Sequence, residues 1–214
     1  MGVGLRPNRR RKGHTPLARA ELPVDTAALA RFLIGKLLVR ELPDGIVSGR
    51  IVETEAYAIG DAAGHAYGGM TPRNRSLFLE RGHVYVYLAY GVSWMLNVSS
   101  EAPGIGAGVL IRALEPVEGV ALMQRNRGIE RLRDLTRGPG RLAQALRIDR
   151  SLDGLDLTRE GPLWLADDDP KLGEVRTRGI GESVRIGISR DAERVLRFYL
   201  RGSPFVSGLR SLNE

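Results

Sequence analysis

Cysteine is missing altogether from the 214 residues, and this absence excludes disulfides, thiolate zinc sites and cysteine nucleophiles. Lysine is scarce, because the basic side chains are almost all arginine and the only lysines are Lys12, Lys36 and Lys171. No apolar run of about eighteen residues is present, so no membrane span is expected. The basic N-terminus is not followed by an apolar segment, which argues against a secretory signal and favours a cytoplasmic, nucleoid-associated location.

Positive charge predominates among the residues that are present. Lysine and arginine together number 32, against 25 aspartates and glutamates, which gives a formal net charge of +7. Such an excess indicates a polyanionic partner such as a nucleic acid. An arginine-rich genomic bias produces the same excess without any partner, so charge alone leaves both interpretations open.

The order of patterns along the chain predicts one α+β domain over residues 21–214, preceded by a mobile basic arm over residues 1–20. We expect a curved, partly barrel-like antiparallel sheet with peripheral helices and a protruding β-hairpin. Asp25 is the expected N-cap of the first helix, and Pro116 is expected in the first turn of the second. The predicted helices are residues 26–35, a segment that begins at Pro116, and 138–148. The predicted strands are residues 36–42, 46–57, 83–90, 92–100, 107–116, 182–189 and 194–202. The predicted long loops are residues 58–76 and 165–182.

The stretch IVETEAY (residues 51–57) raises the question of chemistry. In a strand, Glu53, Glu55 and Tyr57 share one face, and two like charges on one face repel each other unless something compensates them. A metal ion, an acid/base pair, a cationic partner or solvent could do so. Arg112, inside the apolar segment GVLIRALEP, is a natural partner that would keep a carboxylate ionised as a base. A purely structural ion pair is the alternative.

The glycine-rich loop and the helix start that follows offer further polar groups. His65 could join Glu53, Glu55 and Asp61 in a metal site, although no ligand spacing is sharp, or it could hydrogen-bond a substrate and stack on it. The pair Arg73 and Arg75 is typical of phosphate contacts, but solvated loop arginines have the same pattern. Arg137 and Arg141 flank free backbone amides at a helix start, which could bind an anion or form an ordinary helix terminus.

The hairpin HVYVYLAYGVSWMLNVSS (residues 83–100) is rich in aromatics. Tyr85 and Tyr87 share a face of its first strand, and Tyr90 falls at the turn, where a ring is poorly placed for core packing. Tyr90 could insert into a membrane surface, a partner protein or a stack of bases, or it could fold back over the hairpin. Asn97 must find hydrogen-bond partners within an apolar strand, either in the backbone or on a base edge.

Taken together, these motifs resemble the 3-methyladenine (alkylpurine) DNA glycosylase family, of the alkyladenine type. The resemblance runs from about residue 30 to 149 and resumes in LRFYLRGSPFVS (residues 196–207). Its motifs are GRIVETEAY, TPRNRSLF, VYVYLAYG, MLNVSS, VLIRALEP and RGPGRLAQAL. It implies a DNA-repair hydrolase without metal or cofactor that flips damaged purines out of double-stranded DNA and leaves an abasic site. We expect it to act as a monomer without an obligate protein partner.

The resemblance also implies a role for each site residue. Glu55 would be the general base that activates water, and Arg112 would hold that water. Glu53 has no catalytic part. The implied substrate contacts are Tyr57, His65 and Tyr87 stacking on the flipped base, Asn97 crowding the amine of normal guanine, and the Ile186 carbonyl orienting the water. The implied DNA contacts are Tyr90 as a wedge in the minor groove and the arginines Arg73, Arg75, Arg137 and Arg141.

The chain departs from the family in two places, and two other functions stay open. Residues 91–93 lack the second aromatic that some members carry beside the wedge, and residues 167–182 have no counterpart. A lyase would need an amine nucleophile, but the lysines lie outside the motifs, which favours a monofunctional hydrolase. The alternatives are a metal-dependent phosphodiesterase that uses Glu53, Glu55, Asp61 and His65, and a non-catalytic module that binds the minor groove.

Overall fold

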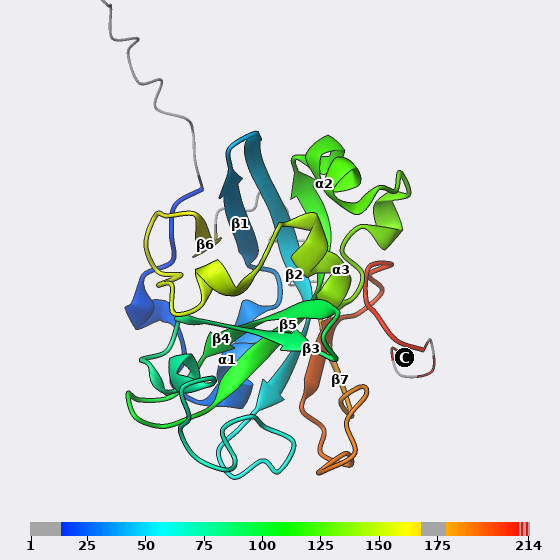
Figure 1. Cartoon of the computed structure of the whole chain (residues 1–214). Coiled ribbons are helices and arrows are strands. Elements are labelled where there is room, and N and C mark those ends of the chain that lie inside the picture. Colours follow the sequence, from blue (N-terminus) through cyan, green and yellow to red (C-terminus); the bar gives the residue numbers. More distant parts are fainter. Residues whose placement is uncertain (1–13, 168–178, 210, 212, 214) are drawn as a thin grey trace, which may run out of the picture.

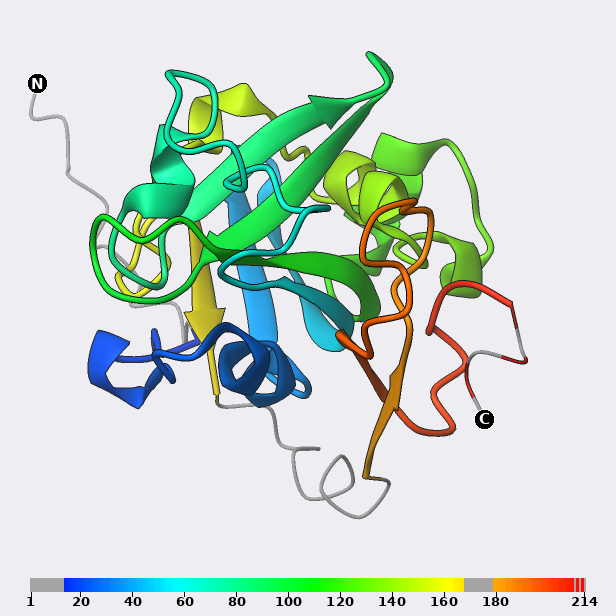
Figure 2. The same cartoon turned by 90° about the horizontal axis from the view of Figure 1, so that it is seen from below.

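The computed structural model describes residues 14–167, 179–209, 211 and 213. Within them the chain forms a single α+β domain, in which an antiparallel sheet curls into a half-barrel with three α-helices at its periphery (Figure 1). A hairpin projects from this body (Figure 2). The predicted fold class is therefore confirmed.

The sheet follows the order β3-β4-β5-β2-β1-β6, and β7 joins it through β8, which pairs with β2. Every described strand pair is antiparallel. The strands are β1 (Leu37–Leu42), β2 (Gly45–Tyr57), β3 (Val84–Ala89), β4 (Ser93–Ser99), β5 (Gly108–Glu118), β6 (Leu163–Ala166), β7 (Ile180–Ser183) and β8 (Arg197–Leu200).

Strand β2 organises the sheet because both of its edges are paired. One edge pairs with β5, and the other is divided between β1 at the start of the strand and β8 near its end. The β2–β5 register shifts on both sides of Glu53, and an irregularity of this kind bends a strand and increases its twist. The bend comes directly before Glu55 and Tyr57, so it sets the direction of the end of β2 that carries the predicted site.

The α-helices are short, with seven or eight residues each. Asp25 caps helix α1 (Thr26–Leu33) as predicted, because its side chain accepts the N–H of Ala28. Leu29 and Leu33 face the core from this helix and are fully buried. Helix α3 (Pro139–Ala145) has its proline in the first turn, as predicted, and it packs against α2 (Val120–Arg127). Short 3₁₀ turns are η1 (Arg19–Glu21), η2 (Arg75–Phe78), η3 (Leu132–Asp134) and η4 (Arg150–Leu152).

The prediction that Pro116 begins a helix is wrong. Pro116 lies within β5, which continues to Glu118, and Val117 is the extra residue of a bulge between them. A proline is tolerated there because a bulge interrupts the ladder, so the missing N–H leaves no partner unpaired. The helix starts only after Gly119, whose positive φ of 71° breaks the strand.

The prediction of a strand over residues 182–189 is also wrong in its position. Strand β7 covers Ile180–Ser183 and ends where the chain turns into a loop. The backbone N–H of Ile186 bonds to Glu55 and the side chain of Arg185 bonds to Asp61, and both contacts draw this segment away from the sheet. The later strand is confirmed but shorter than predicted, and residues 58–74 form the predicted irregular loop.

Two predicted segments lie largely outside the described residues: residues 1–13 of the N-terminal arm and residues 168–178 of the long loop. In the remainder of the arm, Leu17 is buried and Pro16 forms a bridge with Ala166, so residues 14–20 pack against the domain. None of the helices in the described part of the chain has the length and apolarity needed to traverse a bilayer.

Candidate active site

A cavity of about 690 Å³ opens between the end of β2, the loop after it, the β3–β4 hairpin and residues 186–188. Its size is typical of a pocket for a small ligand. The predicted site residues that line it are Tyr57, His65, Arg73, Tyr87, Tyr90, Asn97, Arg112 and Ile186. Segments far apart in the sequence thus converge here, and in Figure 2 the hairpin rises beside the loop that follows β7.

Glu55 is fully buried directly behind the wall of this cavity. Its Oε1 accepts the backbone N–H of Ile186 at 2.7 Å. Its Oε2 accepts the hydroxyl of Tyr57 at 3.1 Å and lies 3.1 Å from Nη1 of Arg112. The residues that supply all three of these contacts line the cavity, so the hydrogen-bond partners of the carboxylate connect it to the pocket.

Glu53 is the structural partner that holds Arg112 from the other side. Its Oε1 accepts Nε–H groups from Arg112 at 2.9 Å and from Arg197 at 2.7 Å, and its Oε2 accepts the N–H of Ser207 at 2.7 Å. Burial alone would raise the pKa of Glu53, but the charges of Arg112 and Arg197 outweigh it and lower the pKa below its usual value. One arginine bridges both glutamates, and its charge makes their position on one strand face tolerable.

Three aromatic rings form one side of the pocket. The rings of His65 and Tyr87 meet edge to face with centroids 4.3 Å apart, and Tyr85 stacks on Tyr87 at 5.6 Å. Nδ1 of His65 and the hydroxyl of Tyr85 share a hydrogen bond of 2.9 Å. Burial, with a smaller effect from Arg73, lowers the pKa of His65, and burial raises the pKa of Tyr85 to about 12. The imidazole is therefore neutral at pH 7 and its orientation is fixed.

Tyr85 lines the cavity but was not among the predicted site residues. The strand alternation that places it on the same face as Tyr87 was the available signal. Asn97 is buried across from it and donates its Nδ2–H to the Tyr85 carbonyl at 3.2 Å. The backbone partner expected for a buried amide is therefore present.

The hairpin tip presents an aromatic side chain to solvent. Tyr90 is 92% exposed and has a positive φ of 50°, and Gly91 follows with φ of 70°. These conformations form the left-handed turn that matches the twist of two antiparallel strands. Val92, two residues after Tyr90, is 80% exposed. The alternative that Tyr90 folds back over the hairpin is therefore wrong.

The predicted phosphate-binding arginines fall into two groups. Arg73 and Arg75 are exposed, and Arg73 lies at the mouth of the cavity. Arg137 donates its Nε–H to the Val206 carbonyl at 2.8 Å, and Arg141 contacts Asp134 at 3.2 Å, so both are partly engaged within the domain. Neither of these two lines the cavity, although Pro139 between them does.

The acidic side chains proposed for a metal site are not grouped around one position in the described part of the chain. Glu53 is held by Arg112 and Arg197, and Asp61 is paired with Arg185. In the part of the chain that the structure describes, no group of three or more His, Asp or Glu side chains is arranged to hold a metal ion. The donor chemistry gives the phosphodiesterase alternative no support, because these carboxylates are already neutralised by guanidinium groups.

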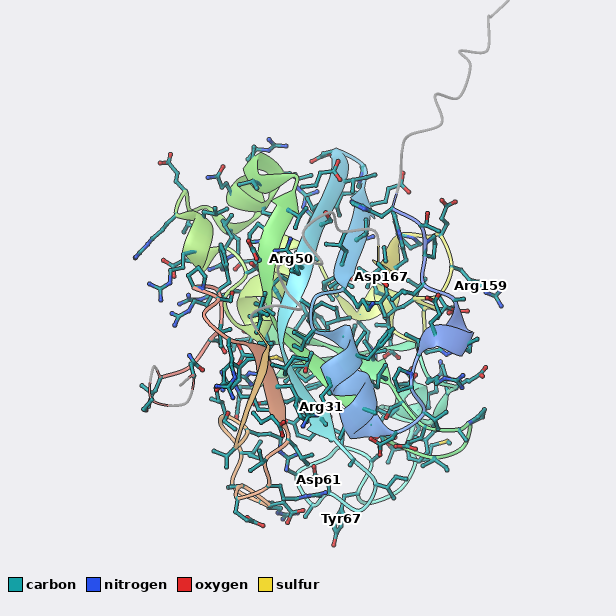
Figure 3. All side chains as sticks on the ribbon, turned by 180° about the vertical axis from the view of Figure 1, so that it is seen from behind. Arg31, Arg50, Asp61, Tyr67, Arg159 and Asp167 are labelled. Atoms are coloured by element: carbon teal, nitrogen blue, oxygen red, sulfur yellow. The ribbon has the colours of Figure 1, made fainter. Side chains whose placement is uncertain are left out.

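Other groups at the pocket were not anticipated by any pattern in the sequence. The guanidinium of Arg185 lies over the ring of Tyr57, 4.7 Å from its centroid. At the mouth, Tyr67 lines the cavity while 61% exposed, and Figure 3 shows it pointing away from the body near Asp61. Tyr67 falls in an aperiodic loop and Arg185 in a segment predicted to be a strand, so only the folded chain identifies their contacts at the pocket.

The chain is similar to known proteins over nearly its whole length. A family model described as methylpurine-DNA glycosylase matches residues 20–204. Three relatives carry the provisional name 3-methyladenine DNA glycosylase. The protein of Mesorhizobium japonicum is 75% identical over 96% of each chain. That of Paraburkholderia phytofirmans is 52% identical over 92% of this chain and 90% of its own, and that of Rubrobacter xylanophilus is 49% identical over 79% and 86%.

Proposed function

The chain belongs to the methylpurine-DNA glycosylase family and is thus a DNA glycosylase of DNA repair, and we propose that it rotates a damaged purine into its cavity and hydrolyses the N-glycosidic bond with a water activated by Glu55. One observation carries this proposal. The buried Glu55 carboxylate is held by three donors that themselves line the pocket: the Tyr57 hydroxyl, Arg112 and the Ile186 N–H.

The hydrogen-bond count of Glu55 leaves room for a water. An ionised carboxylate has about four acceptor positions. Oε2 uses its two for Tyr57 and Arg112, whereas among the described residues Oε1 accepts only the N–H of Ile186. A water bonded to the remaining position of Oε1 would attack C1′ and pass its proton to Glu55. The C1′–N bond breaks with its electron pair on the purine, and an alkylated, cationic purine leaves as a neutral base.

Arg112 keeps the general base, Glu55, in position during this step. Burial alone would lower the pKa of Arg112, but Glu55 and Glu53 together raise it, so the guanidinium stays charged. Its bond to Glu53 fixes it from behind and leaves Nη1 directed at Glu55. The ionised Glu55 also supplies the negative charge that stabilises an oxocarbenium-like sugar. The Ile186 carbonyl remains a predicted contact of the water, in addition to the N–H bond to Glu55.

The aromatic walls would receive the everted base. Tyr57 lies on the side of Glu55, and His65 and Tyr87 supply the other π-faces. Base–aromatic stacking contributes on the order of 1–3 kcal/mol per base and does not depend on a particular base. Cationic purines gain further attraction to electron-rich rings. Asn97, buried in the same pocket, is the proposed barrier to the amine of normal guanine.

The surface around the mouth would bind the duplex. Extruding a nucleotide costs a few kcal/mol of stacking, and insertion of the exposed Tyr90 into the minor groove would offset part of this cost. Arg73 and Arg75 are proposed phosphate contacts beside the cavity. Arg137 and Arg141 are proposed contacts farther along the duplex, through guanidinium N–H groups not used inside the domain.

The reaction is proposed to be monofunctional. Lys36, the only lysine among the described residues, is paired with Asp167 at 2.6 Å and does not line the cavity. An amine nucleophile for a Schiff base is therefore not offered by the described pocket.

The test uses duplexes that each carry one defined lesion. The protein is incubated with them in the presence of chelator, and the released material is identified by mass spectrometry. We expect free damaged purine and abasic sites that break only on treatment with alkali. Strand cleavage without alkali, or no free base from any alkylated or deaminated purine, would contradict the proposal.

A further inference from the structure

A buried ion pair lies beside the pocket, which Asp61 lines, and the pair has no part in the proposed reaction. The side chains of Arg185 and Asp61 are both fully buried and form a two-pronged contact, with Nη2 of Arg185 3.0 Å from Oδ1 of Asp61 and Nη1 bonded to Oδ2. Neither residue acts on a substrate atom in the mechanism above. Their contacts instead connect the segments that carry the residues that do.

Arg185 holds three pieces of backbone together. Its Nη1 donates to the carbonyl of Ala56 in β2 at 3.1 Å, and its Nη2 donates to the carbonyl of Asp191 at 3.1 Å. The Asp191 side chain returns to the loop after β2 and accepts the N–H of Ala62 at 2.9 Å. The end of β2, the loop that leads to His65 and the loop after β7 are thus joined at one guanidinium.

Two of the groups that contact Glu55, the N–H of Ile186 and the hydroxyl of Tyr57, depend on this junction. Ile186, whose N–H bonds to Glu55, directly follows Arg185 in the chain. The guanidinium of Arg185 also covers one face of the Tyr57 ring, 4.7 Å from its centroid, so Tyr57 offers its remaining face to the cavity. A displacement of Arg185 would therefore move both the Tyr57 ring, which lines the pocket, and the Ile186 N–H, which bonds to Glu55.

The energetics of such a pair argue for a positional role. A buried ion pair loses much of its Coulomb attraction to desolvation, and replacing it by neutral groups of similar volume is often neutral for stability. We propose that Arg185 and Asp61 are positioning residues, which set the placement of Tyr57 and Glu55 for base excision. This inference rests on the proposed function of the cavity.

The test replaces both charges at once. In the double variant Asp61→Asn/Arg185→Met, the asparagine can still accept the Ala63 N–H that Asp61 accepts at 3.0 Å, and the methionine keeps the apolar stem. We expect a Tm close to that of the wild type, unchanged affinity for abasic DNA, and a single-turnover excision rate about 100-fold lower, because small misplacements of catalytic groups have effects of this size. An unchanged rate would overturn the proposal.

Lys36 and Asp167 supply the matched control. In this pair Lys36 is buried and Asp167 is about 35% exposed, and it lies beside β1 and β6, far from Asp61 (Figure 3). The double variant Lys36→Met/Asp167→Asn should excise at the wild-type rate. The excision rate of each double variant is compared with its loss of Tm. If the rate falls in both variants only as far as the Tm falls, the Arg185 pair is structural and the proposal is wrong.

Arg185→Lys is the second test, for the case in which the double variant does not fold. A lysine keeps the charge beside Asp61 but cannot bond Ala56 and Asp191 and cover Tyr57 together. Folded Arg185→Lys should excise more slowly than the wild type, and an equal rate overturns the proposal. Failure here is separable from failure of the proposed function, because release of base by the wild type and its loss in Glu55→Gln do not involve Arg185.

Discussion

Nη1 of Arg112 lies 3.1 Å from Oε2 of Glu55, while Nε of the same guanidinium donates to Glu53 at 2.9 Å. One cation therefore bridges two buried carboxylates on the same face of β2, and Arg197 supplies a second positive charge at Glu53. This explains why the sequence IVETEAY can carry two like charges inside the domain, and it assigns different roles to them. Glu53 holds Arg112, and Arg112 holds Glu55.

Arg112→Ala is expected to reduce the free energy of unfolding by about 3–5 kcal/mol, because it leaves two buried carboxylates short of their shared cation. Urea denaturation at pH 7 measures this change. Arg50→Ala is the control, since Arg50 sits at the other end of the β2–β5 ladder and its partner Glu115 is partly exposed and can be solvated. An Arg112→Ala protein no less stable than Arg50→Ala would contradict the bridging role.

His65 is expected to titrate below its ordinary pKa of about 6.5, because burial and Arg73 both disfavour the imidazolium. A depressed pKa in the folded state adds stability that is complete above the unfolded pKa and is lost as the pH falls through the folded pKa. The Tm should therefore decline more steeply in the wild type than in His65→Gln as the pH falls below about 6.5. An NMR titration that places the His65 pKa above 6.5 would show this reasoning to be wrong.

Tyr90→Ala should weaken binding to DNA that carries an abasic site and leave the Tm unchanged. The ring is almost fully exposed, so its removal costs the folded domain nothing, whereas the complex loses the group proposed to fill the vacated stack. Fluorescence anisotropy with labelled duplexes measures the affinity, and Tyr90→Phe should bind like the wild type. Equal affinity of the alanine variant and the wild type would argue against insertion.

Binding should weaken steeply as salt is raised, and Arg73→Ala should reduce the slope of log K against log [salt] by about one unit for each phosphate that the arginine neutralises. The comparison variant is Arg159→Ala, an exposed arginine that pairs with Asp156 and does not line the cavity. A slope that is identical in both variants would remove Arg73 from the DNA interface.

Local patterns predicted β1 to β5, β8, the hairpin and the shared face of β2, because alternation depends on neighbours in the chain, but they missed β6 and misplaced β7. The aligned motifs then identified the pocket residues through resemblance, and the cavity gathers Tyr57, His65, Tyr87 and Asn97 as expected. Arg112 was expected to pair with a carboxylate on this face, but the sequence could not show that Arg197 also holds Glu53, because that contact spans 144 residues.

The wrong predictions came from local rules that the tertiary structure overrides. A proline usually starts a helix, but Pro116 occupies a bulge at the end of β5. The apolar alternation of residues 182–189 is typical of a strand, yet Arg185 and Ile186 leave the sheet to bond Asp61 and Glu55. In both places the local structure is decided by a contact with a residue that is distant in sequence. The neighbouring residues in the chain therefore do not predict it.

The central claim is that the Glu55 carboxylate activates the attacking water, and the single-turnover excision rate of Glu55→Gln tests it most directly. Glutamine can keep the bond from the Ile186 N–H but cannot take a proton from water. With binding to lesion DNA retained, the account predicts a rate at least about 100-fold below that of the wild type, as expected for loss of a general base. Release of methylated purine by Glu55→Gln at the wild-type rate would contradict it.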